Sequence, residues 1–163
     1  MIKVNGAFVS VCYCWLPDKK MESYMICFHM IKKCLAQRNL PFNIIKVTSD
    51  FELAILKALV AVWKVQLRGC NFHFGQCLWR FVQEHGMATV YKENETFKDF
   101  VKSCDGLSDV PLNALIDTID KIKANDWDFE PESEEEKFKE KFLKYIDDTW
   151  VNGAIPPHGK CSF

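Results

Sequence analysis

Residues 44–73 read "IIKVTSDFELAILKALVAVWKVQLRGCNFH", and this stretch decides the fold class. The apolar residues at its start predict a short buried strand over residues 42–50. Residues 64–70, "KVQLRGC", predict a second short strand. Between them, apolar residues recur at helical spacing: Phe51, Ala54, Ile55, Ala58, Leu59 and Val62. A strand, a helix and a strand in this order predict parallel pairing through a right-handed crossover.

The sequence upstream extends the same pattern by one strand and one helix. Residues 7–16, "AFVSVCYCWL", are almost continuously apolar and predict a buried strand. A helix is expected over residues 20–38, because apolar residues again recur at helical spacing: Met21, Tyr24, Met25, Phe28, Ile31 and Leu35. Residues 1–70 are therefore predicted to form an α/β region with a mostly parallel sheet.

The sequence downstream, residues 71–150, is predicted to be almost wholly helical. Its apolar stripes include Leu112, Leu115, Ile116, Ile119 and Ile122, and a later one with Phe138, Phe142, Tyr145, Ile146 and Trp150. Asn94 is expected to cap the helix that follows it. Residues 125–136 form an acidic connector, and residues 151–163 lack periodicity and are predicted to be an irregular tail.

Length and composition limit the classes of protein to which the chain can belong. The length of 163 residues suits one domain, or one domain with a large insertion. The net charge of −1 argues against strong whole-molecule attraction to nucleic acid. Several of its eight cysteines stand where a small apolar residue would fit, which indicates a reducing, intracellular compartment rather than secretion. No apolar run reaches the roughly 18 residues of a membrane span, so no membrane partner is expected.

Asp50 is the first candidate site residue, because it follows an apolar strand and precedes a helix. Ligands and metals gather at the carboxyl ends of strands in α/β sheets, and a carboxylate there can bind a hard cation. The alternative is structural. Ser49 and Asp50 are both good helix N-caps, and local sequence favours that interpretation.

Cys70 and His73 are the second candidate, because a cysteine and a histidine three positions apart can form half of a zinc site. Cys77 lies on the same helical face, but about 10 Å along a regular helix from Cys70. The alternative is a neutral, mostly buried histidine that is hydrogen-bonded within the core. We expect this alternative, and no tightly bound zinc.

Two charged segments allow a functional and a structural interpretation. The carboxylates of residues 126–136 resemble a cation trap, but they lack the glycine and ligand spacing of a calcium loop. A solvated linker that brings negative charge to a helix N-terminus is the favoured interpretation. Residues 137–144, "KFKEKFLK", could contact a phosphate backbone, but a core-facing helix with a charged outer side is favoured.

Taken in order, three segments resemble the catalytic core of Mutator-like element (MULE) transposases. These segments are "LPDKKMESYMICFHMIKKCL", "VTSDFELAILKAL" and "LRGCNFHFGQCLWRFVQEHGMATVYKEN". The later segment "FKEKFLKYIDDTWVNGAIPP" resembles the end of that family's helical insertion. The combination of "SDFE" with "GCNFHF" about twenty residues later carries most of the resemblance, which covers nearly the whole chain.

The resemblance implies a ribonuclease-H-like core over residues 1–70, a helical insertion over residues 71–150 and a nuclear location. It also implies cleavage and transfer of DNA strands by two Mg²⁺ ions held by three carboxylates. Asp50 matches the family's second catalytic aspartate and would be a metal ligand. Cys70 and His73 match the family's Cys-x2-His motif at the start of the insertion.

The chain departs from the family pattern at the other two acids. The first aspartate belongs upstream of residues 7–16 and the glutamate belongs beyond Pro156 and Pro157, and neither is matched here. The chain is therefore expected to be a fragment of the catalytic domain that is inactive alone and binds Mg²⁺ weakly. The alternative is a transposase-derived module that binds DNA or protein without catalysis. The oligomeric state is left open.

Overall fold

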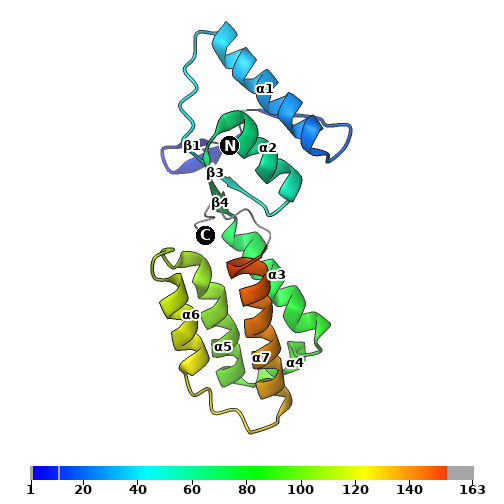
Figure 1. Cartoon of the computed structure of the whole chain (residues 1–163), viewed down its shortest axis with the longest axis vertical. Helices are drawn as coiled ribbons and strands as arrows, with labels where there is room; N and C mark the ends of the chain where they lie inside the picture. Colours follow the sequence, from blue (N-terminus) through cyan, green and yellow to red (C-terminus); the bar gives the residue numbers. More distant parts are fainter. Residues whose placement is uncertain (1, 11, 154–163) are drawn as a thin grey trace. The chain divides into compact units, whose positions relative to one another are not determined.

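The computed structural model describes residues 2–10 and 12–153, which form two compact units (Figure 1). The first unit contains the residues up to Ile45 together with Glu52–Val65. The second unit contains Lys46–Phe51 together with the residues from Gln66 onward. Within the described residues, no helix is both long enough and apolar enough to cross a membrane.

The first unit begins with an antiparallel hairpin instead of the long strand expected over residues 7–16. Strand β1 (Ile2–Val4) pairs with β2 (Ala7–Val9), and Asn5 and Gly6 form the turn with φ angles of 49° and 85°. Two successive residues with positive φ match the strand twist in a two-residue hairpin, and Asn-Gly is the preferred pair. This dipeptide was the local signal for the hairpin.

The apolar residues that follow β2 are not in a strand, so the prediction of a buried strand over residues 7–16 is wrong. Residues 12–20 have no regular secondary structure, and the side chains of Tyr13 and Trp15 are 82% and 98% exposed. The physical reason is pairing: β2 pairs with β1 over three residues, and the described chain offers no neighbour to the residues beyond.

Helices α1 (Met21–Gln37) and α2 (Leu53–Trp63) form the packed part of the first unit. The predicted stripes are confirmed, since the residues predicted on them are buried or half-buried in both helices. The ring of Trp63 packs against Phe28 and Phe42, with centroids 4.7 and 5.3 Å away, and its Nε1 donates to the carbonyl of Phe28. Aromatic side chains therefore join α1, the loop after it and the end of α2.

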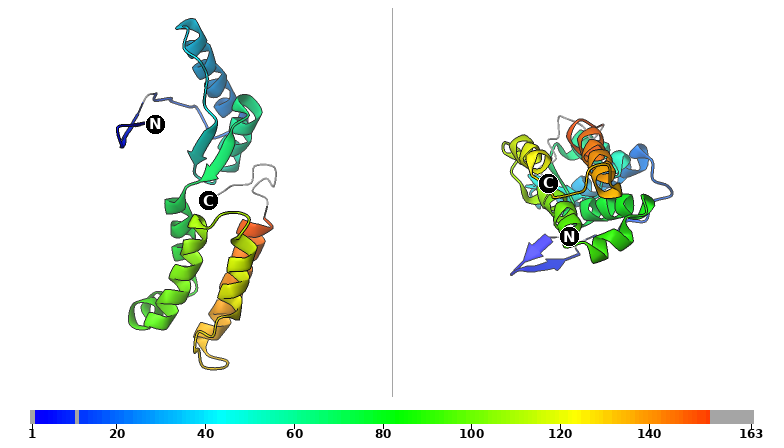
Figure 2. Two further views of the ribbon diagram at one scale, coloured as in Figure 1. Left: turned by 90° about the vertical axis from the view of Figure 1, so that its left-hand side faces the viewer. Right: turned by 90° about the horizontal axis from the view of Figure 1, so that it is seen from below.

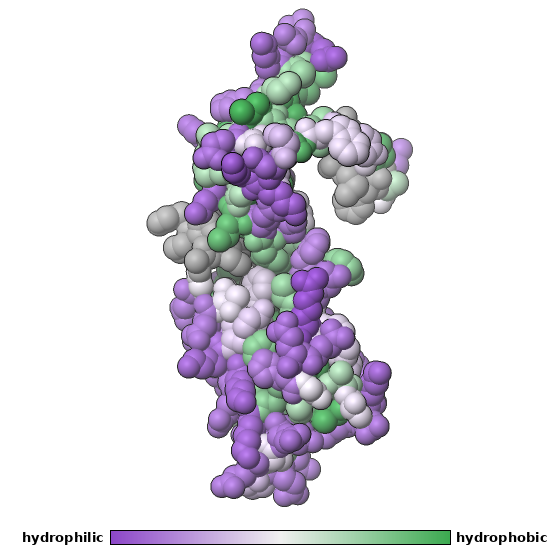
Figure 3. Space-filling model, turned by 90° about the vertical axis from the view of Figure 1, so that its right-hand side faces the viewer, coloured by the Kyte–Doolittle hydropathy of each residue, from purple (hydrophilic) through white to green (hydrophobic). Residues whose placement is uncertain are grey.

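Much apolar surface stays uncovered in the first unit. Ile26 and Met30, one turn apart on α1, are 62% and 60% exposed, and Ile45 is 74% exposed. Green, apolar side chains reach the surface of this unit in Figure 3. Phe28 is the one buried side chain of α1, so α1 depends on a small contact area.

The second unit contains the parallel pair that the sequence predicted. Strands β3 (Lys46–Ser49) and β4 (Gln66–Gly69) pair in parallel, with Lys46 opposite Gln66 and Ser49 opposite Gly69. Both strands are shorter than the predicted segments 42–50 and 64–70. Ile44 and Ile45 precede the ladder in β3. Lys64 is the C-cap of α2 and Cys70 the N-cap of α3, which leaves β4 the residues between them. The α/β prediction is thus confirmed in its coarser form: the fold is mixed and rich in helix, with a small two-stranded parallel sheet.

Helices follow β4, and the described part of the chain from residue 71 contains no strand. They are α3 (Asn71–Glu84), α4 (Ala88–Glu93), α5 (Glu95–Asp105), the 3₁₀ turn η1 (Gly106–Asp109), α6 (Leu115–Ala124), α7 (Glu134–Ile146) and the π-helical turn η2 (Asp147–Val151). Figures 1 and 2 show α3, α5, α6 and α7 side by side as a bundle. The tail predicted over residues 151–163 lies mostly outside the described residues.

Aromatic rings fill the core of this bundle. Phe97, Phe100 and Phe142 are fully buried, and the ring of Phe100 is 5.9 Å from Phe142 and 5.3 Å from Trp127 of the acidic connector. Ile116 is 54% exposed, so its predicted place in the α6 stripe is wrong. It lies one position after Leu115, which places it off the face shared by Leu115, Ile119 and Ile122.

The helix ends in the bundle follow the local sequence. Asn94 Oδ1 accepts a hydrogen bond from the backbone N–H of Phe97 at 3.0 Å, which confirms the predicted cap of α5. Ser133 caps α7 in the same way, with the N–H of Glu136 at 3.2 Å. Glu134, Glu135 and Glu136 occupy the first turn of α7, as expected for a linker that brings negative charge to a helix N-terminus.

Candidate functional site

Asp50 lies directly after β3, at the carboxyl end of the strand, where the sequence placed it. Its side chain is half-buried, and its Oδ1 is 3.4 Å from the hydroxyl oxygen of Ser49. Because Ser49 is opposite Gly69 in the parallel ladder, Asp50 and Cys70 leave the sheet together at the same edge. The register therefore places Asp50 and Cys70, two candidate site residues far apart in the sequence, at the same edge of the sheet.

The alternative interpretation of Asp50 as a helix N-cap is wrong. Helix α2 begins at Leu53, and the residue at its N-cap position is Glu52, whose side chain makes no capping hydrogen bond. Ser49 lies three residues and Asp50 two residues too early for that position. The chain turns through residues 50–52 before the helix begins, because β3 continues to Ser49 and Glu52 is still extended, with φ −71° and ψ 112°.

Cys70 is the N-cap residue of α3, and its backbone is extended, with φ −84° and ψ 113°. The cysteine thus lies off the helix, while its carbonyl accepts the first helical hydrogen bond, from Phe74 at 3.0 Å. The next residue, Asn71, donates from Nδ2 to Asp109 Oδ1 at 2.9 Å, which ties the start of α3 to η1. This start is therefore held in place by packing and by side-chain hydrogen bonds.

An aromatic cluster connects the sheet edge to the helical bundle within the second unit. The ring of Trp150 in η2 lies edge-on to Phe51 at 4.6 Å and to Phe74 at 5.0 Å. Phe51 follows Asp50, and Phe74 follows His73, so the backbone on both sides of the site is packed against one indole ring. Edge-to-face pairs of this kind contribute about 0.5–1.5 kcal/mol each beyond the area that they bury.

His73 differs from its predicted state in one respect. Its ring is half-buried in the first turn of α3 and lies 5.6 Å from the ring of Phe72. The expected hydrogen bond is wrong: Nδ1 is buried and has no hydrogen-bond partner among the described residues. The neighbouring ring of Phe72 is apolar, so it offers Nδ1 no conventional hydrogen-bond partner.

The other cysteines of the helical region act as apolar side chains. Cys77, one of the ligands considered for zinc, is half-buried, and burial raises the pKa of its thiol, opposed in part by the charge of Arg80. Cys104 is fully buried in the bundle core. In the described ranges 2–10 and 12–153, no group of three or more histidine, cysteine or acidic side chains is arranged to hold a metal ion.

Sequence reasoning missed two features of this site. It treated Asp50 and the Cys70–His73 motif independently, because the register of a parallel pair is set by tertiary packing. It also placed Trp150 only in a helical stripe, although this ring contacts both segments of the site. The only local signal was the position of Phe51 and Phe74, each directly after a candidate residue.

Comparisons with protein-family models, with curated proteins and with solved structures found no match for this chain.

Proposed function

We propose that this chain is part of the catalytic region of a MULE-type transposase, with a partial ribonuclease-H-like core and a helical insertion. In this proposal Asp50 is a metal-binding catalytic carboxylate, and Cys70 and His73 mark the start of the insertion. The observation that carries the proposal is the parallel register, which brings Asp50 and Cys70 to one sheet edge where α3 begins. DNA is the proposed partner, and the nucleus is the proposed location.

The residues present fit the proposed Mg²⁺ chemistry only in part. Asp50 offers hard oxygen ligands at a sheet edge, which suits Mg²⁺. A metal pair bound there would stabilise the attacking and leaving oxygens of a phosphoryl transfer. One carboxylate does not hold a pair of ions, so the role of Asp50 in this chain is to contribute a ligand, with water and DNA phosphates as the others.

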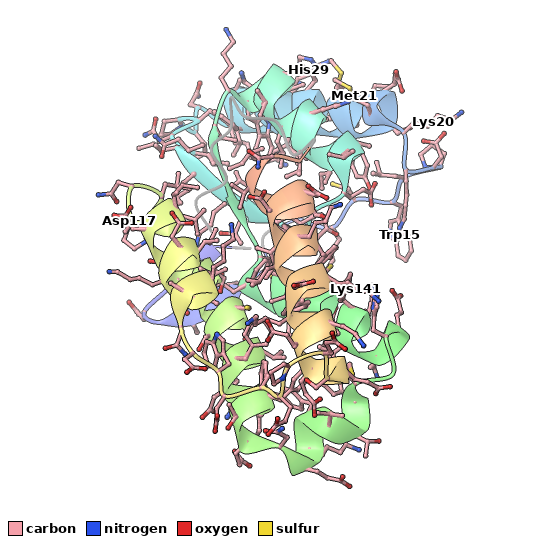
Figure 4. The ribbon with its side chains drawn as sticks, turned by 60° about the horizontal axis from the view of Figure 1, so that its bottom comes forward. Trp15, Lys20, Met21, His29, Asp117 and Lys141 are labelled. Carbon is pink, nitrogen blue, oxygen red and sulfur yellow. The ribbon has the colours of Figure 1, made fainter. Side chains whose placement is uncertain are left out.

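The proposal predicts metal binding that depends on DNA. Mn²⁺ is a suitable probe because its paramagnetic signal reports the free ion. We expect weak binding of Mn²⁺ to the full 163-residue chain, stronger binding when duplex DNA is added, and loss of that gain in Asp50→Asn. Asp117→Asn is the matched control, because Asp117 is an exposed carboxylate on α6 (Figure 4).

The two possible failures of this experiment are distinct. If Asp50→Asn binds Mn²⁺ like the wild-type chain in the presence of DNA, the assignment of Asp50 is wrong. The same samples with supercoiled plasmid and Mg²⁺ are expected to show neither nicking nor joining. Metal-dependent cleavage that disappears in Asp50→Ala would contradict the proposed inactivity of the isolated chain and support a complete site.

A second candidate function is a transposase-derived module that binds a partner without catalysis. The observation that favours it is the exposure of the aromatic side chains Tyr13 and Trp15 on the irregular segment after β2. A gel-shift assay separates the two candidates. Binding of DNA that is independent of metal and unchanged in Asp50→Asn would support the module.

A further inference from the structure

Two cysteine thiols lie together in the first unit. Cys12 and Cys14 belong to the irregular segment after β2, and their sulfur atoms are 3.4 Å apart. Cys27 on α1 is near enough to Cys14 to raise the pKa of the Cys14 thiol. Cys12 and Cys14 are exposed, and Cys27 is half-buried.

These thiols do not replace apolar core residues as Cys104 does. An exposed cysteine buries little area, so its packing contributes little to folding, and its chemistry as a soft donor becomes the relevant property. The neighbouring Trp15 is also exposed and projects from the same segment (Figure 4). The segment has no helical or strand hydrogen bonds that would oppose a small shift of either sulfur.

The two sulfurs are close enough to share one metal ion after a local rearrangement. On a two-coordinate ion the sulfurs lie on opposite sides, about 4.5 Å apart, which is about twice the metal–sulfur distance. The observed 3.4 Å is about 1 Å shorter, which rotation of both side chains would open. Thiolates select soft ions, Cu(I) among them.

We propose that Cys12 and Cys14 bind one Cu(I) ion as a pair of thiolate ligands. Cu(I) suits this arrangement because it accepts as few as two thiolates, whereas a structural zinc site takes four ligands. The low coordination number agrees with the described residues, where no larger set of ligands surrounds a common point. Binding replaces the two S–H protons, which pass to solvent.

The test is a titration of the full, reduced chain with Cu(I) under anaerobic conditions, in competition with a chromophoric Cu(I) chelator. We expect one equivalent to bind more tightly than any later one. Cys12→Ser and Cys14→Ser should each lose this first equivalent, and Cys77→Ala on α3 should keep it. Because Cys12 and Cys14 are exposed, the serine variants should retain the wild-type circular dichroism spectrum.

Two results would overturn the proposal. One is a wild-type chain without a distinct tight equivalent, which would mean that the paired sulfurs do not form a site. The other is a Cys12→Ser/Cys14→Ser double variant that binds the first equivalent as tightly as the wild-type chain, which would place the ion on other thiols.

Discussion

At the residue scale, burial separates cysteines of the same chain into two kinds. Cys104 is enclosed by the bundle core, and this burial raises the pKa of its thiol from 9.0 to about 12. Cys12 and Cys14 are exposed, and their pKa values are raised chiefly by hydrogen bonds to another thiol. The same side chain is thus an apolar core residue in one place and an accessible donor in another.

The raised pKa of Cys104 predicts a loss of stability at alkaline pH. Its proton is held more tightly in the folded state, so the contribution is complete below about pH 9 and is lost as pH rises toward 12. In urea unfolding, the wild-type chain should lose more stability from pH 9 to pH 11 than Cys104→Val, whose side chain does not titrate. Cys34→Ser, which changes an exposed cysteine, should lose as much stability from pH 9 to pH 11 as the wild-type chain. Equal losses for Cys104→Val and the wild-type chain would contradict the prediction.

The buried Nδ1 of His73 predicts different results for two substitutions. His73→Leu should lower the free energy of unfolding by less than about 1 kcal/mol, because it removes an unpaired polar atom whose burial costs about 1–3 kcal/mol. His73→Ala should lower it by about 1–2 kcal/mol, because ring contacts are lost. Equal losses for both variants in denaturant unfolding would mean that Nδ1 has a partner in solution.

At the element scale, capping residues set the helix starts in the bundle. Asn94 is predicted as a cap from its type and position, and its side chain accepts the expected backbone hydrogen bond. The structure adds Ser133, whose hydroxyl caps α7 in the same way. By contrast, α2 begins after Glu52 and lacks a side-chain cap, although Ser49 and Asp50 precede it. The continuation of β3 to Ser49 decided that boundary, because Ser49 pairs with Gly69 in the ladder and the helix begins only after the turn that follows.

The observed caps predict the cost of their removal. Asn94→Ala and Ser133→Ala should each lower the free energy of unfolding by about 1 kcal/mol, because one backbone N–H loses its partner. Ser103→Ala is a suitable control, because its hydroxyl bonds a carbonyl inside α5 and caps no helix. Thermal unfolding of the three variants measures these changes in stability. If Ser103→Ala loses as much stability as Asn94→Ala and Ser133→Ala, capping is not the cause of the losses.

At the scale of the whole molecule, the two units differ in how much apolar surface they bury. Helix α5 of the second unit buries Phe97, Phe100, Val101 and Cys104, whereas α1 of the first unit buries Phe28 alone. Stability is rarely uniform along a chain, and elements with few buried contacts open first. The second unit is therefore expected to be the more stable part.

This difference predicts the pattern of amide hydrogen exchange. Amides at the centre of α1 should exchange at least about tenfold faster than those at the centre of α5, because α1 opens at a lower free energy. Helix α2, in the same unit as α1 but with four buried side chains, serves as an internal comparison and should exchange more slowly than α1. Equal protection of α1 and α5 would contradict the expected difference in stability between the two units.

The sequence by itself determined the elements that have strong local patterns. The stripes of α1, α2 and α7, the cap at Asn94 and the order strand–helix–strand around Asp50 follow from periodicity and side-chain chemistry. These depend on neighbours within a few residues along the chain. The core-facing interpretation of residues 137–144 held for the same reason: Phe138 and Phe142 are buried, and Lys141 points outward in Figure 4.

Tertiary structure alone decided the features that depend on partners far away in sequence. Residues 12–16 are as apolar as a buried strand, but the described chain gives them no strand to pair with, so Tyr13 and Trp15 are exposed. The register of β3 with β4 brought Asp50 beside Cys70, and the indole ring of Trp150 fixed the backbone on both sides. The physical reason is that a strand needs a pairing partner and a ring needs packing neighbours. Both come from segments that are distant in sequence, so a local sequence pattern does not identify them.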